Sequence, residues 1–296
     1  MSSFKVMKAA NLSLTTGVRY PALVSPKIDG RRAFIENGKV HSSSGKPIRS
    51  SLIQSMFGHK ELNGLDGELT VGSPVDPEAF RKTGAISSED GDVEDSVFNV
   101  FDCIRTGVGF SERLAEAKKK VSVFFRSHLR MVDHYLVNSK QEIEKYEAKF
   151  LEEGYEGLMY RTIDGPYKNG RSTHKEMYLM KLKRFTDGEA QVTDFVEMMH
   201  NNNEKTLTAA GGKLKRGSSK AGKECSGVLG ALVCRDLTTG DIVELGTGFT
   251  NEERETIWKN RGDYVGSIVK YKHFQVGGYS KPRHPVFLGF RDVDDM

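Results

Sequence analysis

Short apolar runs, each bounded by Gly, Pro, Asn or Asp, recur along this chain and limit what it can fold into. Runs of this length that are rich in Val, Ile, Phe and Tyr are typical of β-strands. Residues 32–36, 67–71 and 96–102 are the first three, and further runs lie at 156–161 and 177–185. The sequence therefore predicts many short strands, with helices only where the apolar period changes.

Two segments of the N-terminal half have helical periodicity. Ser111 is expected to cap a helix with Leu114, Val121, Phe125 and Leu129 on one side. Ser139 and Glu142 predict a capping box for a second helix, whose apolar stripe is Ile143, Tyr146 and Phe150. Gly154 is placed to end that helix.

After Phe185 the pattern changes to strands with one short helix, for which Thr250 and Glu253 predict a capping box. The strand-like runs are residues 192–199, 227–234, 241–248, 267–274 and 285–290. Several strands and one helix within ~110 residues are typical of an OB-fold. We therefore predict an α+β chain with two domains. Residues 1–187 form a mixed α/β domain with antiparallel sheets, and residues 188–296 form an OB-fold β-barrel.

The net charge of +4 comes from one segment, residues 201–225. Its charged residues are Lys205, Lys213, Lys215, Arg216, Lys220 and Lys223, against Glu204 and Glu224. Six cations and two anions account for the whole excess, and Gly, Ser and Asn fill much of the rest. Such an arm either binds phosphates, ordering as it does so, or is a solvated loop without a partner. Charge alone does not decide between them.

Composition excludes several classes of protein. No apolar run approaches the ~18 residues that a membrane span requires, and the N-terminus lacks the apolar core of a secretory signal. Cys103, Cys225 and Cys234 are far apart and form no CxxC pair, which argues against structural zinc and disulfides. A cytoplasmic protein with free thiols and no membrane partner is expected.

Residues 25–32 read SPKIDGRR, in which Lys27 precedes Asp29, Gly30 and Arg32. Alone, this stretch could be a charged β-turn. It could also hold a lysine that attacks phosphorus, which must be neutral, whereas a free lysine with a pKa near 10.4 is mostly charged. Clustered cations favour the neutral amine and would also stabilise charge on a phosphate in the transition state.

Five more patches follow in order: DGEL, FNVFD, EGLMYR, MKLKR and RHPVFLGFR, at 66–69, 98–102, 156–161, 180–184 and 283–291. Together with the Lys27 motif, their order and spacing resemble the covalent nucleotidyltransferases, which are ATP-dependent DNA ligases and mRNA capping enzymes. The resemblance is closest to the compact viral DNA ligases and extends over nearly the whole chain. Each patch alone is a weak signal.

The resemblance implies a nucleotidyltransferase domain of ATP-grasp-like mixed α/β type and a nucleotide site within it. Lys27 would form lysyl-AMP, and Arg32 would contact the ribose or the 3′-OH side of a nick. Glu68 would bind the ribose and Phe98 would stack on adenine. Lys181 and Lys183 would bind the α-phosphate. Magnesium or manganese would be organised by carboxylates, namely Asp29, Glu68 and Glu156.

The same resemblance implies contacts to nicked duplex DNA. Arg171 would contact phosphate near the nick, and the basic arm would clamp the duplex through Lys213, Lys215, Arg216 and Lys220. Related ligases usually carry an arginine where this chain has Ser43, and Lys46 or Arg49 is expected to replace it. Residues 283–291 would either orient pyrophosphate or form an ordinary barrel strand.

The function expected from the resemblance is that of a monomeric ATP-dependent DNA ligase, which adenylylates itself and then seals nicks. Two alternatives share some of the motifs. An mRNA guanylyltransferase would form lysyl-GMP instead, and a non-catalytic OB-type protein would bind nicks without being adenylylated.

Overall fold

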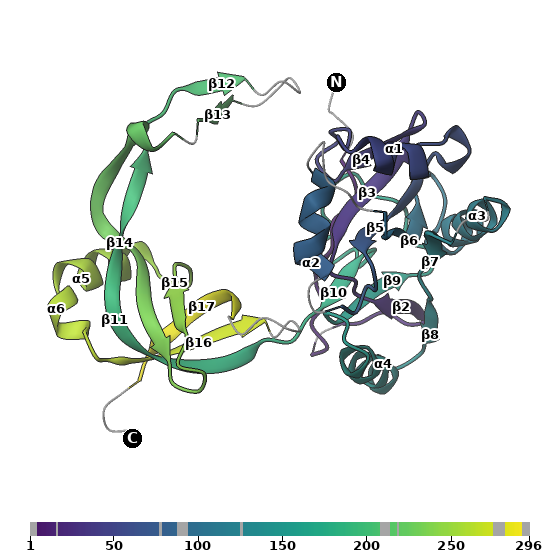
Figure 1. The fold of residues 1–296 in the computed structure, drawn as a ribbon. Helices are drawn as coiled ribbons and strands as arrows, with labels where there is room; N and C mark the ends of the chain where they lie inside the picture. The colour runs from purple at the N-terminus through teal and green to yellow at the C-terminus, as the bar shows by residue number, and fades with distance from the viewer. Residues whose placement is uncertain are drawn as a thin grey trace. The chain divides into compact units, whose positions relative to one another are not determined.

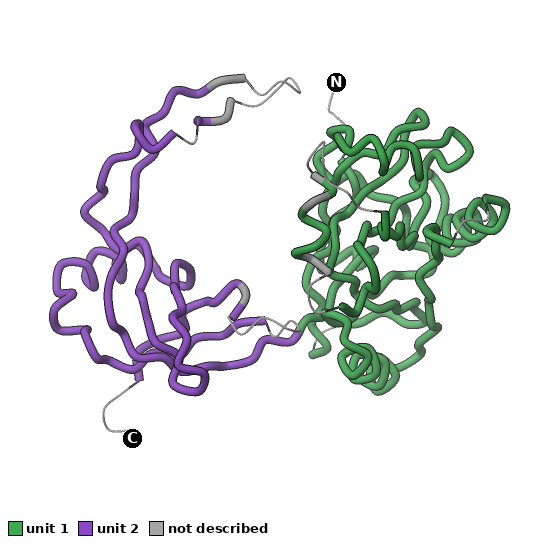
Figure 2. Tube along the Cα trace, in the orientation of Figure 1, with its two compact units in different colours: residues 1–183 green, residues 184–296 purple. Residues whose placement is uncertain are grey.

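The computed structural model describes residues 5–15, 17–76, 79–87, 94–124, 127–207, 214–217, 219–274 and 282–291. The chain divides into two compact units, Met1–Lys183 and Arg184–Met296 (Figure 2). This division lies after Lys183 rather than after residue 187, because strand β11 (Thr186–Asn201) is a continuous part of unit 2 (Figure 1).

Unit 1 contains two five-stranded sheets. The first has the order β1 (Ala10–Asn11), β10 (Met180–Leu182), β9 (Leu158–Thr162), β2 (Ala22–Pro26) and β8 (Tyr135–Val137). The second has the order β4 (Lys39–Ser42), β3 (Arg31–Glu36), β5 (Leu65–Val71), β6 (Ser96–Cys103) and β7 (Leu129–Met131). Pairing is antiparallel except for β1 with β10 and β6 with β7. The predicted antiparallel sheets are confirmed.

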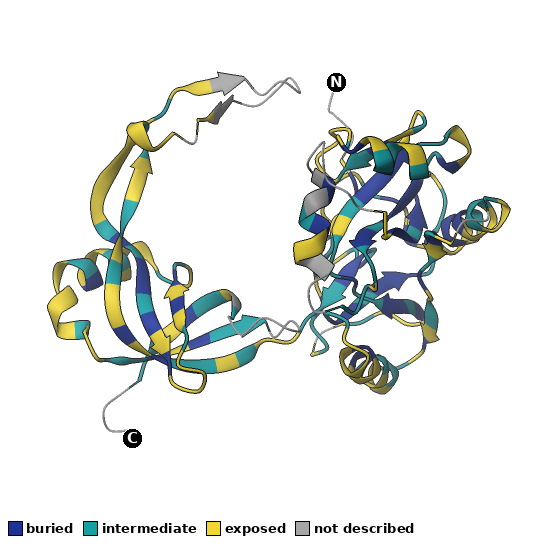
Figure 3. Cartoon of the chain, viewed as in Figure 1, coloured by how far each residue is buried: buried dark blue, intermediate teal, exposed yellow. Residues whose placement is uncertain are grey.

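The helices of unit 1 pack on these sheets. They are α1 (Ser51–Phe57), η1 (Lys60–Leu62), α2 (Ala79–Lys82), η2 (Thr83–Ser87), α3 (Phe110–Val123) and α4 (Lys140–Glu152). Buried residues lie mainly on the strands, and the outer faces of the long helices are exposed (Figure 3). Each sheet contributes its own apolar cluster, one centred on Phe57 and Phe98, the other on Phe150 and Tyr160.

Two helix predictions need correction. Helix α3 starts one residue before Ser111, with Gly109 at the N-cap, and ends at Val123; Leu129 lies in β7, paired with Phe98. Phe125 lies outside the described residues. In α4, Ser139 caps Glu142 as predicted, but the Glu142 carboxylate accepts a hydrogen bond from Asn138 rather than from Ser139. Gly154 follows α4 with φ of 92°, a left-handed conformation that favours glycine.

Unit 2 is a five-stranded antiparallel sheet with the order β15 (Ile242–Leu245), β14 (Lys223–Asp236), β11, β16 (Ile268–Phe274) and β17 (Arg283–Phe290). Helices α5 (Asn251–Lys259) and α6 (Arg261–Tyr264) complete it, and the Thr250–Glu253 capping box is present as predicted. Among the described residues no ladder joins the edge strands β15 and β17 to close the expected barrel; instead Phe287 N of β17 donates to Thr247 O, just after β15, at 2.9 Å.

The predicted arm lies between β11 and β14 and contains regular structure. Strands β12 (Lys205–Leu207) and β13 (Leu214–Arg216) form an antiparallel hairpin, and the 3₁₀ turn η3 (Lys220–Gly222) leads into β14. Residues 208–213 and 218 of the arm lie outside the described residues, and the expectation that the arm orders on binding DNA stays a prediction.

Two further expectations concern membrane spans and cysteines. Within the described ranges, no helix combines the length and apolar character needed to cross a bilayer. All three cysteines are free; Cys103 and Cys234 are buried and Cys225 is exposed.

Candidate active site

A cavity in unit 1 lies between the two sheets and is lined by residues that the sequence singled out. Lys27 and Ile28 follow β2, Arg32 and Glu68 come from β3 and β5, and Lys181 comes from β10. Strands of both sheets thus bring together motifs that are far apart in sequence. Strand β10 is shorter than the predicted run of 177–185, and Lys183 lies just beyond its end.

Glu156 joins two of the predicted lysines. The Lys27 ammonium contacts one of its carboxylate oxygens and the Lys183 ammonium contacts the other. The Glu156 side chain is only 5% exposed, whereas those of Lys27 and Lys183 are 20% and 16% exposed. One carboxylate therefore holds two of the predicted amines together, and one of them, Lys27, lines the cavity.

Backbone hydrogen bonds fix the position of Lys27 relative to Glu156. The Lys27 N–H donates to Gly157 O at 2.9 Å, and the Glu156 N–H donates to Lys27 O at 3.1 Å. Gly157 has φ of 147°, and a Cβ there would lie 2.3 Å from Leu182 O. Glycine at this position therefore lets the segment that carries Lys181 and Lys183 approach closely.

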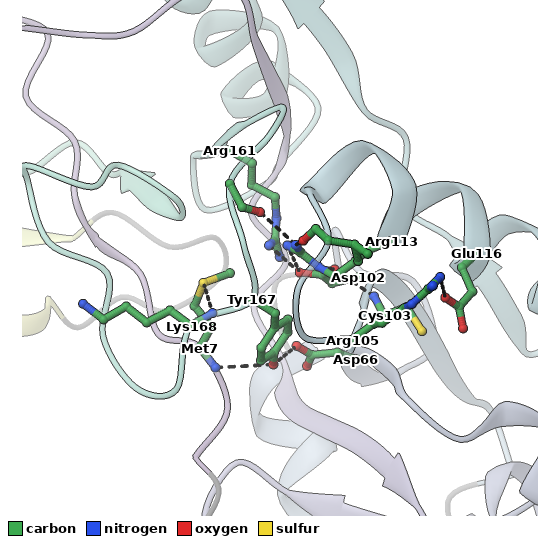
Figure 4. Close-up of polar contacts among 12 residues, drawn as sticks. Met7, Asp66, Asp102, Cys103, Arg105, Arg113, Glu116, Arg161, Tyr167 and Lys168 are labelled. Atoms are coloured by element: carbon green, nitrogen blue, oxygen red, sulfur yellow. Dashed lines mark hydrogen bonds and ion pairs between the residues drawn. The ribbon is translucent and has the colours of Figure 1, made fainter.

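Arg32 is held by a carboxylate that the sequence reading did not assign. Its guanidinium binds Asp66 through two bonds, of 2.9 and 2.5 Å, and also donates to Met7 O at 2.5 Å. Burial acts to lower the pKa of Arg32, but the charge and hydrogen bonds of Asp66 outweigh it and raise that pKa. Tyr167 donates to the same carboxylate at 2.7 Å (Figure 4), and burial together with Asp66 raises the pKa of its hydroxyl.

Glu68 lies in the cavity wall in an environment that disfavours its charge. Burial raises its pKa to about 7, with Asp66 and Asp29 adding to the rise, while Lys27 and Arg32 oppose it. At neutral pH this carboxyl is thus divided between its two protonation states. A group poised in this way in a cavity is a candidate for a functional role.

Lys181 faces the same space. Burial lowers its pKa, and the charges of Lys27 and Arg171 lower it further. This is the clustering of cations that a lysine nucleophile requires. Lys181 therefore lies close enough to Lys27 for their charges to interact.

The aromatic residue on the cavity wall is Phe101, not the predicted Phe98. Phe98 is fully buried in the core, 5.7 Å from the ring of Phe57. Phe101 lies three residues along the same strand, on the opposite face, and lines the cavity. The guanidinium groups of Arg32 and Arg161 lie 5.3 and 5.5 Å from its ring centroid.

A buried ionic cluster lies behind this wall and was also missed by the sequence reading. Asp102 accepts hydrogen bonds from Arg113 at 2.9 Å and from Arg161 at 2.6 Å, and all three are almost completely buried (Figure 4). Burial lowers the pKa of Arg161, and the neighbouring Arg113 and Arg32 lower it further. The only sequence signal was a charged residue, Asp102, near the end of the apolar run that forms β6.

The predicted metal ligands form only part of a site. Among the residues that the structure describes, no three His, Cys, Asp or Glu side chains converge as a metal cluster. Asp29 and Glu68 lie close enough for their charges to interact. This fits an ion held by one or two carboxylates together with water and a substrate's phosphates, which is the usual arrangement for magnesium.

The predicted DNA-binding residues are dispersed. Lys46 and Arg49 are exposed, as is Ser43, and Arg171 is exposed while donating to Ala9 O at 2.5 Å. Arg216 and Lys220 are exposed on the arm, and Lys215 pairs with Thr206 in its hairpin. Lys213 lies outside the described residues. The motif at 283–291 forms β17, and Arg291 binds Glu189 at 2.5 Å.

Comparison with known proteins places these features in a family. Residues 6–183 match the model of the ATP dependent DNA ligase domain, and residues 221–291 match that of the DNA ligase OB-like domain. A DNA ligase of African swine fever virus is 28% identical over 109 residues, covering 34% of this chain. The match spans about a quarter of that relative's length, 25%.

Two solved structures are similar along nearly the full chain. The Chlorella virus DNA ligase-adenylate is 28% identical with a TM-score of 0.54, and 98% of each chain is covered. A Lig E DNA ligase is 24% identical with a TM-score of 0.75, covering 98% of this chain and 100% of that one. The second likeness concerns the fold alone.

Proposed function

Since this chain belongs to the family of ATP-dependent DNA ligases, we propose that it seals nicks in duplex DNA through a lysyl-AMP intermediate. The observation that carries the proposal is the cavity in which Lys27, Glu68 and Lys181 meet, with Lys183 joined to Lys27 through Glu156. Nicked DNA is the substrate, the protein acts as a monomer, and it works in the cytoplasm.

In the first step Lys27 Nζ attacks the α-phosphorus of ATP, a phosphoramidate bond forms and pyrophosphate leaves. Glu156 holds the attacking amine in place and can accept its proton. Lys181 and Lys183 stabilise negative charge on the α-phosphate. Glu68 binds the ribose, and Phe101, rather than Phe98, provides the aromatic surface for adenine.

A magnesium ion bound with ATP would neutralise the triphosphate and help pyrophosphate leave. Asp29 and Glu68 are the carboxylates positioned to share in holding it or its waters. Glu156, which is engaged by two lysines, would contribute only after one of them turns to the phosphate.

In the later steps AMP passes to the 5′-phosphate of the nick, and the 3′-OH then attacks that phosphate and displaces AMP. Arg171, Lys46 and Arg49 are the exposed cations of unit 1 assigned to the phosphates flanking the nick. Arg32, locked to Asp66, is assigned to the sugar side of the site. The arm supplies sequence-independent backbone contacts through Lys213, Lys215, Arg216 and Lys220.

Covalent labelling tests the proposal. The protein is incubated with magnesium and either [α-³²P]ATP or [α-³²P]GTP, and the protein-bound label is measured before and after a nicked duplex is added. We expect ATP to label the unsubstituted protein and also the control variant Lys39→Ala, in which an exposed lysine of β4 is replaced. A nicked duplex should discharge the label from both. Lys27→Ala should take up none.

Each other outcome contradicts the proposal in a defined way. Labelling by GTP alone would indicate a guanylyltransferase. Absence of label with both nucleotides would indicate a binding protein. Label that persists after the nicked duplex is added would contradict DNA sealing.

A further inference from the structure

Three consecutive asparagines, Asn201 to Asn203, lie where the arm changes direction (Figure 1). The long ladder between β11 and β14 ends at the pair Asn201–Lys223, and the hairpin ladder begins at the pair Lys205–Arg216. The two segments that connect these pairs have unequal lengths, so a regular ladder cannot continue between them. The backbone groups there need other partners.

The asparagine side chains supply many of those partners. The Asn201 amide donates to Gly217 O at 3.0 Å, and the Asn203 amide donates to Ser219 O at 2.8 Å and to Asn201 Oδ1 at 2.7 Å. Asn201 Oδ1 also accepts from the backbone N–H of Asn203 at 3.1 Å. We refer to residues 201–203 together with the described residues 216–217 and 219–222 as the elbow.

Backbone and charged groups reinforce the elbow. The Asn202 N–H donates to Gly222 O at 2.7 Å, and the Gly217 N–H donates to Glu204 O. The Arg216 guanidinium donates to Asn203 O at 3.1 Å, so one cation of the hairpin is tied to the bend. Gly222 packs so closely that a Cβ there would lie 2.2 Å from Asn203 Oδ1. These contacts connect the segment that leaves β11 with the segment that leads into β14.

A bend connected in this way has a defined angle before any partner binds. An arm that must order on binding loses affinity through that ordering, whereas a preformed one does not. We propose that the Asn201–Asn203 elbow is a positioning device that presents the basic hairpin at a fixed angle to the β11–β14 stem, preformed for the phosphate backbone of duplex DNA. This inference rests on the proposed function for its partner, and on the hydrogen bonds alone for its geometry.

Amide hydrogen exchange of the DNA-free protein tests the geometry without any ligase activity. Peptides covering residues 200–206 and 216–224 should exchange more slowly than an unstructured chain. Asn203→Ala, which removes two donated bonds, should speed that exchange by about tenfold. Random-coil exchange in the parent would overturn the inference, even if the protein is adenylylated and seals nicks.

Sealing kinetics test the positioning role. Asn203→Ala should raise the KM for a nicked duplex by about tenfold, while lysyl-AMP formation and kcat at saturating DNA stay unchanged. The control is Asn260→Ala, an exposed asparagine of unit 2 for which the structure records no side-chain hydrogen bond. An unchanged KM in Asn203→Ala, or an equal rise in the control, would overturn the role.

A second variant approaches the elbow from the other side. Gly222→Ala should displace the Asn203 side chain and raise KM similarly. Because the alanine at 203 removes the clashing atoms, the double variant should be no worse than Asn203→Ala alone. Additive effects would contradict the contact. If the parent itself is never adenylylated, the proposed function fails, while the exchange result still decides whether the elbow exists.

Discussion

Replacing Glu68 by glutamine should stabilise unit 1 at alkaline pH. The pKa of Glu68 is raised from 4.5 to about 7, first by burial and then by the negative charges of Asp66 and Asp29. The folded state therefore holds a proton between these two values that the unfolded chain has released. Stability contributed by this group is full below about pH 4.5 and is lost as the pH rises through 7.

The magnitude follows from the difference between the two pKa values. About 2.5 units at 1.36 kcal/mol per unit give an unfavourable contribution of about 3 kcal/mol above pH 8. Glutamine cannot ionise, so the variant does not carry this unfavourable contribution. The advantage of Glu68→Gln in the free energy of unfolding should thus grow by about 2–3 kcal/mol between pH 5 and pH 8.

The measurement must distinguish the two units. Trp258, the single tryptophan, lies in α5 of unit 2, so its fluorescence serves as an internal reference that should not change. Amide exchange in β5 and β6 reports the opening of unit 1. Glu36→Gln, at an exposed carboxylate on β3, is the control. An advantage that is equal at pH 5 and pH 8, or that also occurs in the control, would refute the reasoning. The stabilised variant should still adenylylate poorly, since it lacks the carboxylate that we propose binds the ribose.

Four other perturbations probe the site and the arm. Glu156→Gln leaves two lysine ammonium groups facing a neutral amide and should slow lysyl-AMP formation by about 100-fold in single-turnover labelling; a parent-like rate would contradict the pairing. Phe98→Ala should lower the free energy of unfolding by about 3–5 kcal/mol with the KM for ATP unchanged, whereas Phe101→Ala should raise that KM, and the opposite result would restore Phe98 as the stacking ring. Asp102→Asn should cost about 3–5 kcal/mol in urea unfolding, because it leaves buried arginines without a counter-charge. Replacing residues 203–222 by Gly-Gly should reduce the log–log salt slope of DNA binding by about four if four phosphates are contacted; an unchanged slope would contradict the clamp.

The sequence predicted two helix caps correctly, because a cap depends only on residues within one turn of the helix. The Thr250–Glu253 capping box and the Ser139 cap are complete within one helical turn, and both are present. The helix after Gly109 was extended too far because Leu129 continues its spacing. That residue instead pairs with Phe98 in a parallel ladder, a non-local interaction that periodicity cannot detect.

The site residues show the same distinction. Motif order identified Lys27, Glu68 and Lys181, which the fold brings to one cavity. Phe98 and Phe101 lie in one apolar run, and their motif does not state which one faces the cavity, although their odd spacing places them on opposite faces. Asp66 and Asp102 were missed as ligands of arginines because their partners lie far along the chain.

The reciprocal backbone bonds between Lys27 and the Glu156–Gly157 segment have a consequence for recombination. These partners lie 129 positions apart, yet they form one rung of hydrogen bonds that sets the spacing of amine and carboxylate. A chimera whose crossover falls between them inherits the two halves of that rung from different parents. Functional crossovers between related ligases should therefore be concentrated at the junction after Lys183, where a block containing both partners is exchanged intact.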